Sequence, residues 1–372
     1  MKKINLEEYT KSKKLLLVFD VVIKSEVFNK DAFLEERKIA PSSYRRARAK
    51  EQKVGEEIVL KLSTYFGLKL VDDEFIKNLE KLIDSLYFDI NYRVIENHEK
   101  YIKEIDEMLL ENTILFPILK LIKLFAITFY DKDVLDTVAE NIEDFEYVSQ
   151  FTAFFNDDLM EIYDLLRLSY SKTFTKEMLA KQYKNGISYS IIAAKHCLDK
   201  KYYDSLFFAL KAKNIFINEN NLRRILCINF TILNNLASTW NFEEYYNLAY
   251  VQMQIIKSFR IETSEKNVCN KHITISALSM GRYDDVCSMV EINKNITLTE
   301  VFCYVIAKFN TKKLKDFKIW YDDFLVKRKI PTQVKEKCDI LIDYLILPEK
   351  RKIIEIEQCS IMPALIEVLK WS

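Results

Sequence analysis

The scarcity of glycine and proline constrains the fold of this chain more than any other feature. Only 4 glycines and 5 prolines occur in 372 residues. Hairpins, sandwiches and doubly wound sheets depend on these residues at their turns, so such folds are disfavoured. The sequence instead predicts an all-α protein built from long helices that polar turns connect.

The length and composition indicate a folded protein with more than one core. A single hydrophobic core rarely extends beyond about 250–300 residues, so we expect two domains or an extended repeat array. Hydrophobic residues make up 49% of the chain and charged residues 30%. This balance is typical of folded rather than disordered proteins.

Cysteine spacing and the apolar stretches bear on the compartment. The 7 cysteines form no C-x-x-C pair, so neither a disulfide framework nor a zinc site is expected. Glu7, Glu8 and Asp20 flank or interrupt the first apolar run, unlike a secretory leader. The most apolar stretch, 114–130, is short for a membrane span. We expect a cytoplasmic protein that does not enter a membrane and needs no cofactor.

Positive charge is concentrated near the N-terminus. Residues 1–70 hold 16 basic and 10 acidic side chains, whereas the whole chain has a net charge of +1. This first segment therefore carries +6 and the remainder −5. A basic head on an acidic body predicts that the head alone binds a polyanion.

Three short helices can be predicted within the basic head. The first covers 31–37. Pro41 suits the first position of the next helix, where its missing N–H costs nothing, so a second helix is expected over 41–50. A third is expected over 56–66, where Gly67 ends it.

The helix that begins at Pro41 is the candidate DNA-reading element. Tyr44 and Ala47 lie three residues apart on one face and are expected in the core. Arginines can bind guanine edges through paired hydrogen bonds, and hydroxyls can reach phosphates or bases. A solvated charged face without a function is the alternative. The residues predicted to bind double-stranded DNA are Ser42, Ser43, Arg45, Arg46, Arg48 and Lys50.

Two short helices joined by a tight turn, the second of them cationic, fit the major groove of DNA. The segment resembles the helix-turn-helix domain of the Xre and phage-repressor superfamily. Ile39 stands at the apolar position of that pattern before the turn, and Leu62, Phe66, Gly67 and Leu68 match its closing stretch. The resemblance implies that the first 70 residues form a helix-turn-helix DNA-binding domain.

A short signal recurs every 40 to 41 residues in the C-terminal half. A polar turn precedes an aromatic residue and a new helix at Tyr202, Phe242 and Tyr283. The pattern resembles the inter-helix turn of tetratricopeptide-type repeats. It predicts a tetratricopeptide-like helical-repeat solenoid over 186–372, ending in capping or dimerisation helices. The intervening residues, 71–185, are expected to form a helical linker and the first helical pairs.

Stacked helix pairs leave a concave groove that commonly binds extended peptides. Asn229 and Asn270 fall at equivalent points of two repeats, with Asn234 and Lys271 close by. An asparagine can bind both the N–H and the C=O of a peptide backbone. The alternative is that these side chains are solvated or cap helices. The predicted peptide-binding residues are Asn229, Asn234, Asn270 and Lys271.

Catalytic signatures are missing from the sequence. Four glycines cannot build a phosphate-binding loop, and no metalloprotease or serine-hydrolase motif occurs. His98, His196 and His272 stand far apart and are interpreted as core or surface residues. We therefore expect that the protein is not an enzyme.

A helix-turn-helix head followed by tetratricopeptide-like repeats resembles the peptide-pheromone receptors of Gram-positive bacteria and their phages, a group that includes the Rgg, PlcR and arbitrium-receptor families. The resemblance implies a cytoplasmic homodimer whose repeats bind a short signalling peptide. That peptide would change operator binding, as in quorum sensing. Two alternatives stay open: a scaffold for protein interactions, and a regulator without a small ligand.

Overall fold

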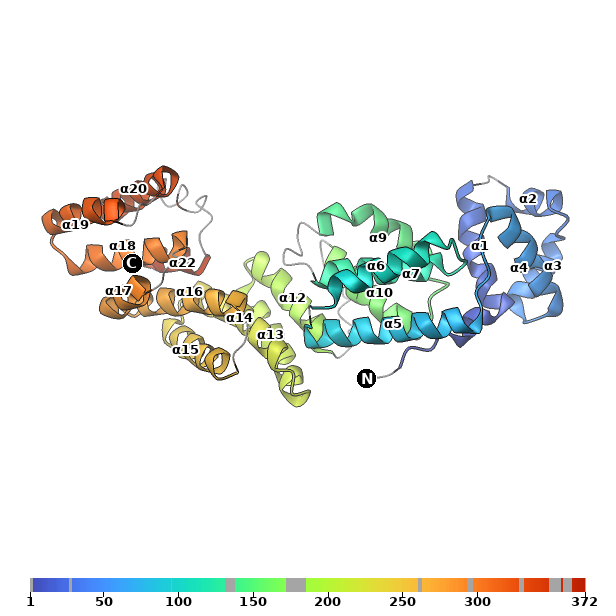
Figure 1. Ribbon diagram of the computed structural model, residues 1–372, viewed down its shortest axis with the longest axis horizontal. Coiled ribbons are helices and arrows are strands. Elements are labelled where there is room, and N and C mark those ends of the chain that lie inside the picture. Colours follow the sequence, from blue (N-terminus) through green and yellow to red (C-terminus); the bar gives the residue numbers. More distant parts are fainter. Residues whose placement is uncertain are drawn as a thin grey trace. The chain divides into compact units, whose positions relative to one another are not determined.

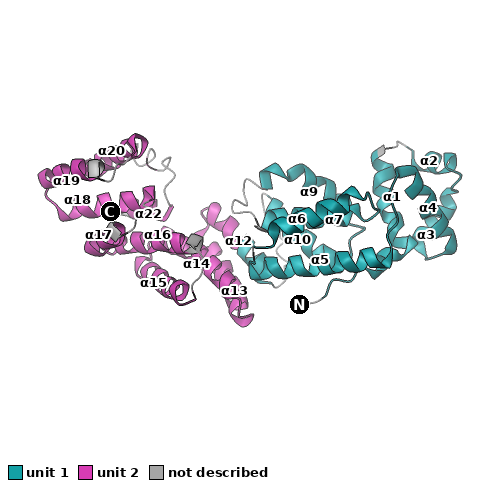
Figure 2. Cartoon of the chain, in the orientation of Figure 1, with its two compact units in different colours: residues 1–191 teal, residues 192–372 magenta. Residues whose placement is uncertain are grey.

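The protein is all-α, as predicted. In this computed structural model the described residues are 3–26, 29–94, 96–130, 138–171, 185–259, 263–292, 297–327, 331–347, 356 and 363–371. Within these ranges the regular structure is helical, apart from an isolated bridge between Lys69 and Thr113. The chain divides into two compact units, residues 1–191 and residues 192–372 (Figure 2).

The N-terminal part of unit 1 is a group of four helices. They are α1 (Ser12–Glu26), α2 (Lys30–Glu36), α3 (Pro41–Ala49) and α4 (Lys53–Phe66). Leu16, Val18 and Phe19 of α1 are fully buried, and α1 packs on both α3 and α4. The last three of these helices were predicted from the sequence, whereas α1 was not. Figure 1 shows α1 on the side of the group that adjoins the rest of unit 1, and α3 on the opposite side.

The remainder of unit 1 is organised around its most apolar helix. This helix, α7, packs on the four helices that surround it. The predicted apolar stretch at 114–130 thus becomes the interior of a bundle, with Leu121, Ile122 and Phe125 buried. The helices are α5 (Asp73–Tyr92), α6 (His98–Leu110), α7 (Phe116–Tyr130), α9 (Ile142–Ser149) and α10 (Asp157–Tyr170). In the part of the chain that the structure describes, every helix is too short or too polar to cross a bilayer.

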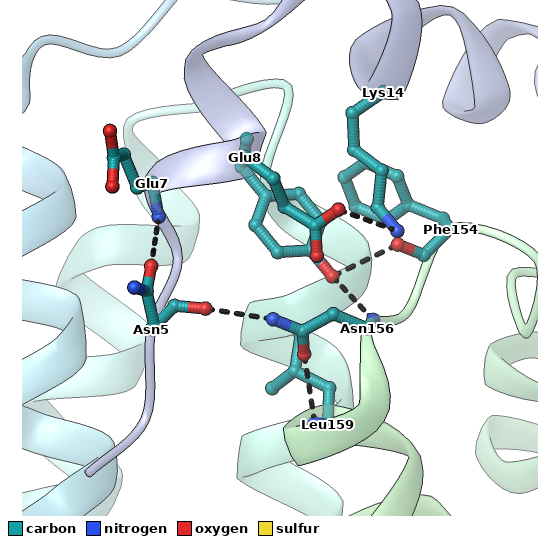
Figure 3. A network of polar contacts seen from close by, with 8 residues as sticks. Asn5, Glu7, Glu8, Lys14, Phe154, Asn156 and Leu159 are labelled. Carbon is teal, nitrogen blue, oxygen red and sulfur yellow. Dashed lines mark hydrogen bonds and ion pairs between the residues drawn. The ribbon is translucent and has the colours of Figure 1, made fainter.

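The N-terminal residues fasten the four-helix group to this bundle. A single 3-10 turn, η1 (Glu7–Thr10), precedes α1. The Tyr9 hydroxyl donates to the carbonyl of Phe154 at 2.9 Å and accepts from the Asn156 N–H at 2.8 Å. The Asn156 amide donates to the Asn5 carbonyl at 2.7 Å (Figure 3). Residues 1–70 therefore belong to the same compact unit as the helices that follow.

Unit 2 is a succession of helices in which each member from α13 to α18 packs on the next. α12 spans the boundary between the units, and α22 packs on both α14 and α16. The helices are α12 (Gly186–Leu198), α13 (Tyr202–Asn218), α14 (Leu222–Ser238), α15 (Phe242–Ser258), α16 (Thr263–Ser279), α17 (Tyr283–Ile292), α18 (Leu298–Thr311), α19 (Leu314–Lys327), α20 (Thr332–Ile346) and α22 (Pro363–Trp371).

One turn geometry recurs in unit 2. The three aromatic residues of the recurring sequence signal are the first residues of α13, α15 and α17. Two residues before each aromatic, Lys200, Trp240 and Gly281 have φ of 60°, 58° and 68°. The next N–H donates to the carbonyl five residues earlier, at 2.8, 2.9 and 2.9 Å, which closes the preceding helix. The predicted intervals of 40 and 41 residues therefore separate turns of the same shape.

Cysteines and metal-ligating groups are dispersed in the structure. The six cysteines within the described ranges are free, and Cys269, Cys287, Cys303 and Cys338 are buried. Cys359 lies outside the described residues. Among the residues with described positions, histidines, cysteines and carboxylates form no cluster that could hold a metal ion.

Candidate nucleic-acid interface

A tight turn sets the angle at which α3 leaves α2. Lys38 adopts a left-handed conformation with φ of 57°. The N–H of Ile39 donates to the Leu34 carbonyl at 2.9 Å, and the Ile39 side chain is buried. Ala40 is extended, and Pro41 begins α3 without a side-chain cap. Two short helices joined by a tight turn therefore lie on either side of Ile39 and Ala40.

The inner face of α3 is held against α1 through Tyr44. This side chain is 1% exposed. Its hydroxyl lies 2.9 Å from both the Leu16 carbonyl and the Asp20 carboxylate of α1. Burial raises the pKa of Tyr44 well above its ordinary value, so the phenol stays neutral and keeps its proton for these acceptors.

A second junction fixes α3 and α4 to the start of α1. A Cβ atom on Gly55 would lie 2.5 Å from the Ser12 hydroxyl and 3.4 Å from the Cβ of Ala47, so this position admits no side chain without rearrangement. Glu51, in the loop between α3 and α4, accepts hydrogen bonds from the Ser12 N–H at 3.0 Å and the Lys13 N–H at 3.1 Å. The loop carboxylate thereby caps α1.

Asp20 is the charged centre of the four-helix group. Its carboxylate forms ion pairs with Lys30 of α2 and with Arg48 of α3. The Arg48 side chain is 38% exposed, and burial lowers the pKa of its guanidinium. Arg48 was predicted to bind DNA, but its side chain points toward α1, because Asp20 presents a carboxylate there. The ion pair with Asp20 joins α3 to α1, and the predicted contact of Arg48 with DNA stays a prediction.

The outward face of α3 carries most of the other predicted residues. Arg45 forms an ion pair with Asp31 of α2, with the two side chains 69% and 50% exposed. Such exposed pairs contribute about 0–1 kcal/mol, so a phosphate could replace Asp31 at little cost. Arg46 lies 3.4 Å from the Ser43 hydroxyl, and Ser43 is half-buried. The exposed members of the predicted set are Ser42, Arg45, Arg46 and Lys50.

A further cation lies beside this face and was not predicted from the sequence. Arg37 directly follows α2, is exposed, and stacks on Tyr65 of α4 with its guanidinium carbon 3.9 Å from the ring centre. A stacked guanidinium keeps its donors free in the plane and loses conformational freedom. Arg37 is therefore a further candidate phosphate contact. In the sequence, the only feature that could have indicated this role is the position of Arg37 at the start of the turn between α2 and α3.

The residues predicted to bind a peptide lie on two helices of unit 2. Asn229 and Asn270 are each the eighth residue of their helix, α14 and α16. Asn229 is 3% exposed, and its side-chain oxygen has no hydrogen-bond partner among the described residues. The side-chain oxygen of Asn234 likewise has no hydrogen-bond partner among the described residues. Asn270 and Lys271 are half-buried. Both helices contact α22 of the same chain.

Two further buried amides of unit 2 had no signal in the sequence. The Asn235 amide donates to the Ser205 hydroxyl, which in turn donates to the Ala193 carbonyl, both at 2.7 Å. The Gln252 amide donates to the Leu226 carbonyl at 3.1 Å. These bonds link α12 to α13, α13 to α14, and α14 to α15. Asn235 is buried because α13 packs against it, so the residue pattern of its own helix, α14, could not predict its burial.

His272 is a core residue, whereas the sequence left core and surface positions open for it. It is 1% exposed. Its Nδ1 lies 2.8 Å from the Tyr245 hydroxyl, and its ring stacks on Phe230 with centroids 5.8 Å apart. Burial, and secondarily the charge of Lys271, lowers the pKa of His272 to about 3. The imidazole is therefore neutral in the folded protein at physiological pH.

Comparison with known proteins adds no relative. No protein-family model, curated protein or solved structure matches this chain.

Proposed function

We propose that this protein is a cytoplasmic transcriptional regulator that binds double-stranded DNA through α3 and is not an enzyme. The observation that supports the proposal is the division of α3 into two faces. Tyr44 and Ala47 anchor one face in the core, while Arg45 and Arg46 are exposed on the other and Lys50 is exposed just after the helix ends. A helix of this kind can enter the major groove with its cations toward phosphates and base edges.

The anchoring of α3 favours binding because the interface is fixed before DNA arrives. The bonds of Tyr44 to α1 and of Glu51 to the start of α1 hold the helix in place. A preordered helix loses less conformational entropy on binding than a mobile one. Arg45 exchanges one exposed carboxylate for a phosphate, which is a small electrostatic change.

The proposed regulator acts as a homodimer. One helix-turn-helix head reads only half of a site, and two linked heads bind far more tightly than one. The expected operator therefore consists of two half-sites related by two-fold symmetry.

The experiment that tests DNA binding uses the full chain, because residues 5–9 bind the helices of the bundle. Fluorescence anisotropy of a labelled mixed-sequence duplex would be measured between 50 and 200 mM salt. We expect affinity to fall steeply with salt, with a slope of about −0.9 per phosphate contact. The variant Arg45→Ala plus Arg46→Ala should lose most binding and up to about two units of that slope.

The control removes the same charge elsewhere. Lys100 and Lys103 of α6 are 70% and 78% exposed, so Lys100→Ala plus Lys103→Ala should retain the wild-type affinity and slope. If the arginine variant binds as the wild type does, the assignment of α3 is wrong. If the wild type binds no duplex, the scaffold alternative gains support.

A peptide ligand is the second part of the proposed function. Asn229 and Asn270 occupy equivalent positions on α14 and α16, and the buried oxygen of Asn229 offers an acceptor without a partner among the described side chains and backbone. A buried acceptor in this condition costs about 1–3 kcal/mol unless a ligand or water satisfies it. A short peptide whose N–H groups reach these amides would recover that cost. This peptide would favour one arrangement of the two heads and so change operator binding.

Thermal unfolding with candidate signalling peptides tests this second part. A peptide that binds only the folded state raises the unfolding temperature, and above its Kd the shift grows with the logarithm of the peptide concentration. We expect the shift to disappear in Asn229→Ala and to persist in the control Asn247→Ala, which alters an exposed position of α15. Equal shifts in both variants would exclude Asn229 from the site. DNA binding without any peptide response would favour the regulator that has no small ligand.

A further inference from the structure

Helix α13 is apolar on two opposite sides. One side is buried by its neighbours and consists of Ser205, Ala209, Ala212 and Phe216. At 100° per residue, these four positions fall within one narrow arc of the helix. The opposite arc should then be polar, as on a surface helix of a globular protein, but it is not.

The exposed side of α13 carries a row of large apolar side chains. Tyr203 is 79% exposed, Phe207 54%, Leu210 45% and Ile217 48%. Asn214 is also exposed and completes the row, which we call the α13 seam: Tyr203, Phe207, Leu210, Asn214 and Ile217. The five positions are separated by four, three, four and three residues. This spacing keeps them within about 80° of one another on a helix and is that of a coiled-coil seam.

Helix α15 provides the internal comparison. It has the same length of 17 residues and follows the same recurring turn. Its outer side exposes Tyr250 and Val251, but these two are surrounded by polar and charged residues at Glu243, Glu244, Asn247, Gln254 and Lys257. The apolar row of α13 is therefore not a general property of the helices that follow this turn.

We propose that the α13 seam is the dimer interface, and that it pairs in parallel with the same seam of a second copy of this chain. The heptad spacing makes the surface complementary to itself about a two-fold axis. A single asparagine within an apolar seam typically pairs with its own copy in a parallel two-stranded coil, where it fixes register and chain number. Asn214 occupies that position, between Leu210 and Ile217.

The alternative antiparallel registers use the seam less well. Each antiparallel register pairs only four of the five seam positions and leaves one end of the seam, Tyr203 or Ile217, unpaired. Each also sets Asn214 opposite Leu210 or Tyr203 rather than opposite itself. The parallel arrangement pairs all five positions.

The flanking charges also suit the parallel arrangement. Lys211 lies beside the seam, with its ammonium 4.3 Å from the centre of the Phe207 ring. In the parallel pair Lys211 would stand opposite Leu206, and Lys213 opposite Asn218, so neither cation meets a like charge. In the antiparallel register that pairs Phe207 with Ile217, Lys211 and Lys213 would each meet their own copies, which is unfavourable.

This proposal supplies a surface for the homodimer of the proposed function, but it is argued from α13 alone. A monomeric protein that still binds DNA would refute the seam and leave DNA binding intact. A dimer that pairs through the seam but has no affinity for DNA would support the seam and refute DNA binding.

The first experiment is sedimentation equilibrium of the full chain at micromolar concentrations. The wild type should sediment at twice its mass of 44.2 kDa. Leu210→Asp should weaken the dimer by about 30-fold or more, because it places a charge in the centre of the interface. The matched control is Tyr250→Asp, which changes the equivalent ninth residue of α15 at a similar exposure, and it should leave the dimer unchanged. Circular dichroism confirms that both variants are folded.

The second experiment tests the parallel register. Asn214→Cys should form a disulfide between two chains under copper phenanthroline oxidation, visible on a non-reducing gel. Gln254→Cys, at the equivalent position of α15, should not, and neither should the wild type with its native cysteines. A monomeric wild type, or a dimer that Leu210→Asp leaves intact, overturns the proposed interface. A dimer that Leu210→Asp disrupts but Asn214→Cys does not cross-link overturns the parallel arrangement.

Discussion

Lowering the pH should destabilise unit 2 through a single buried imidazole. The His272 ring is enclosed, with Nδ1 2.8 Å from the Tyr245 hydroxyl, and burial lowers its pKa to about 3 from an ordinary 6.5. Between these two values the unfolded chain binds a proton that the folded chain excludes. The stabilisation is therefore complete above pH 6.5 and is lost as the pH falls from 6.5 toward 3.

The magnitude follows from proton linkage. Each pH unit within that window changes the free energy of unfolding by about 1.4 kcal/mol. Between pH 7 and pH 5 the loss due to His272 is about 2 kcal/mol, because the transition in the unfolded chain is only beginning at pH 7. Carboxylates add their own pH dependence, so a matched variant is required. His272→Gln has a side chain of similar polarity that does not titrate in this range.

Tryptophan fluorescence in urea measures this loss in the appropriate unit, because Trp240, Trp320 and Trp371 all lie within residues 192–372. The wild type should lose about 2 kcal/mol more than His272→Gln between pH 7 and pH 5, although the variant starts from a lower stability. If both proteins lose the same amount, His272 is not held neutral by burial, and the reasoning about its environment is refuted.

Three other changes test the packing of the head and of the last helix. Gly55→Ala should destabilise unit 1 by about 1–3 kcal/mol in thermal circular dichroism, because its Cβ would overlap the Ser12 hydroxyl; unchanged stability would contradict the close approach. Asp20→Asn should lower the same transition by about 1–3 kcal/mol through the loss of both ion pairs, and Asp31→Asn, which removes only an exposed pair, should change it by less than about 1 kcal/mol. Leu365→Asp, fully buried in α22, should detach that helix and increase the binding of a fluorescent apolar dye; no increase would mean that α22 covers little apolar surface.

Local patterns predicted the head well where the determinants are close in sequence. Pro41 marks the start of α3, and Tyr44 and Ala47 show its buried face, because each depends only on helix geometry. The helix over 56–66 begins three residues earlier than predicted, at Lys53. Terminal turns depend on capping and tertiary contacts, so their boundaries are less well determined by sequence.

Long-range partners explain what could not be predicted. Arg48 turns inward because Asp20 lies on α1, a helix that was interpreted only as an apolar run unlike a leader. The spacing of Leu15, Leu16, Phe19 and Ile23, all buried, is a helical period that could have indicated α1. With α1 in view, the acid within its apolar run, Asp20, would have suggested a cationic partner on a neighbouring helix.

In unit 2 the recurring turns were visible because they repeat, whereas the burial of individual amides was not. The signal before each aromatic residue corresponds to one left-handed turn geometry at Lys200, Trp240 and Gly281. Asn235 is instead buried by its bond to Ser205 on another helix, which a pattern within α14 does not encode. The DNA-binding and peptide-binding residues stay predictions, because their partners are separate molecules.

Selection of bound sequences from a pool of random duplex DNA tests the central proposal most directly. We predict that the full-length protein enriches a site composed of two half-sites with two-fold symmetry, and that the chain with alanine at positions 45 and 46 enriches none. A pool that stays random after repeated selection, or the same site enriched by both proteins, would contradict recognition of DNA by the exposed face of α3.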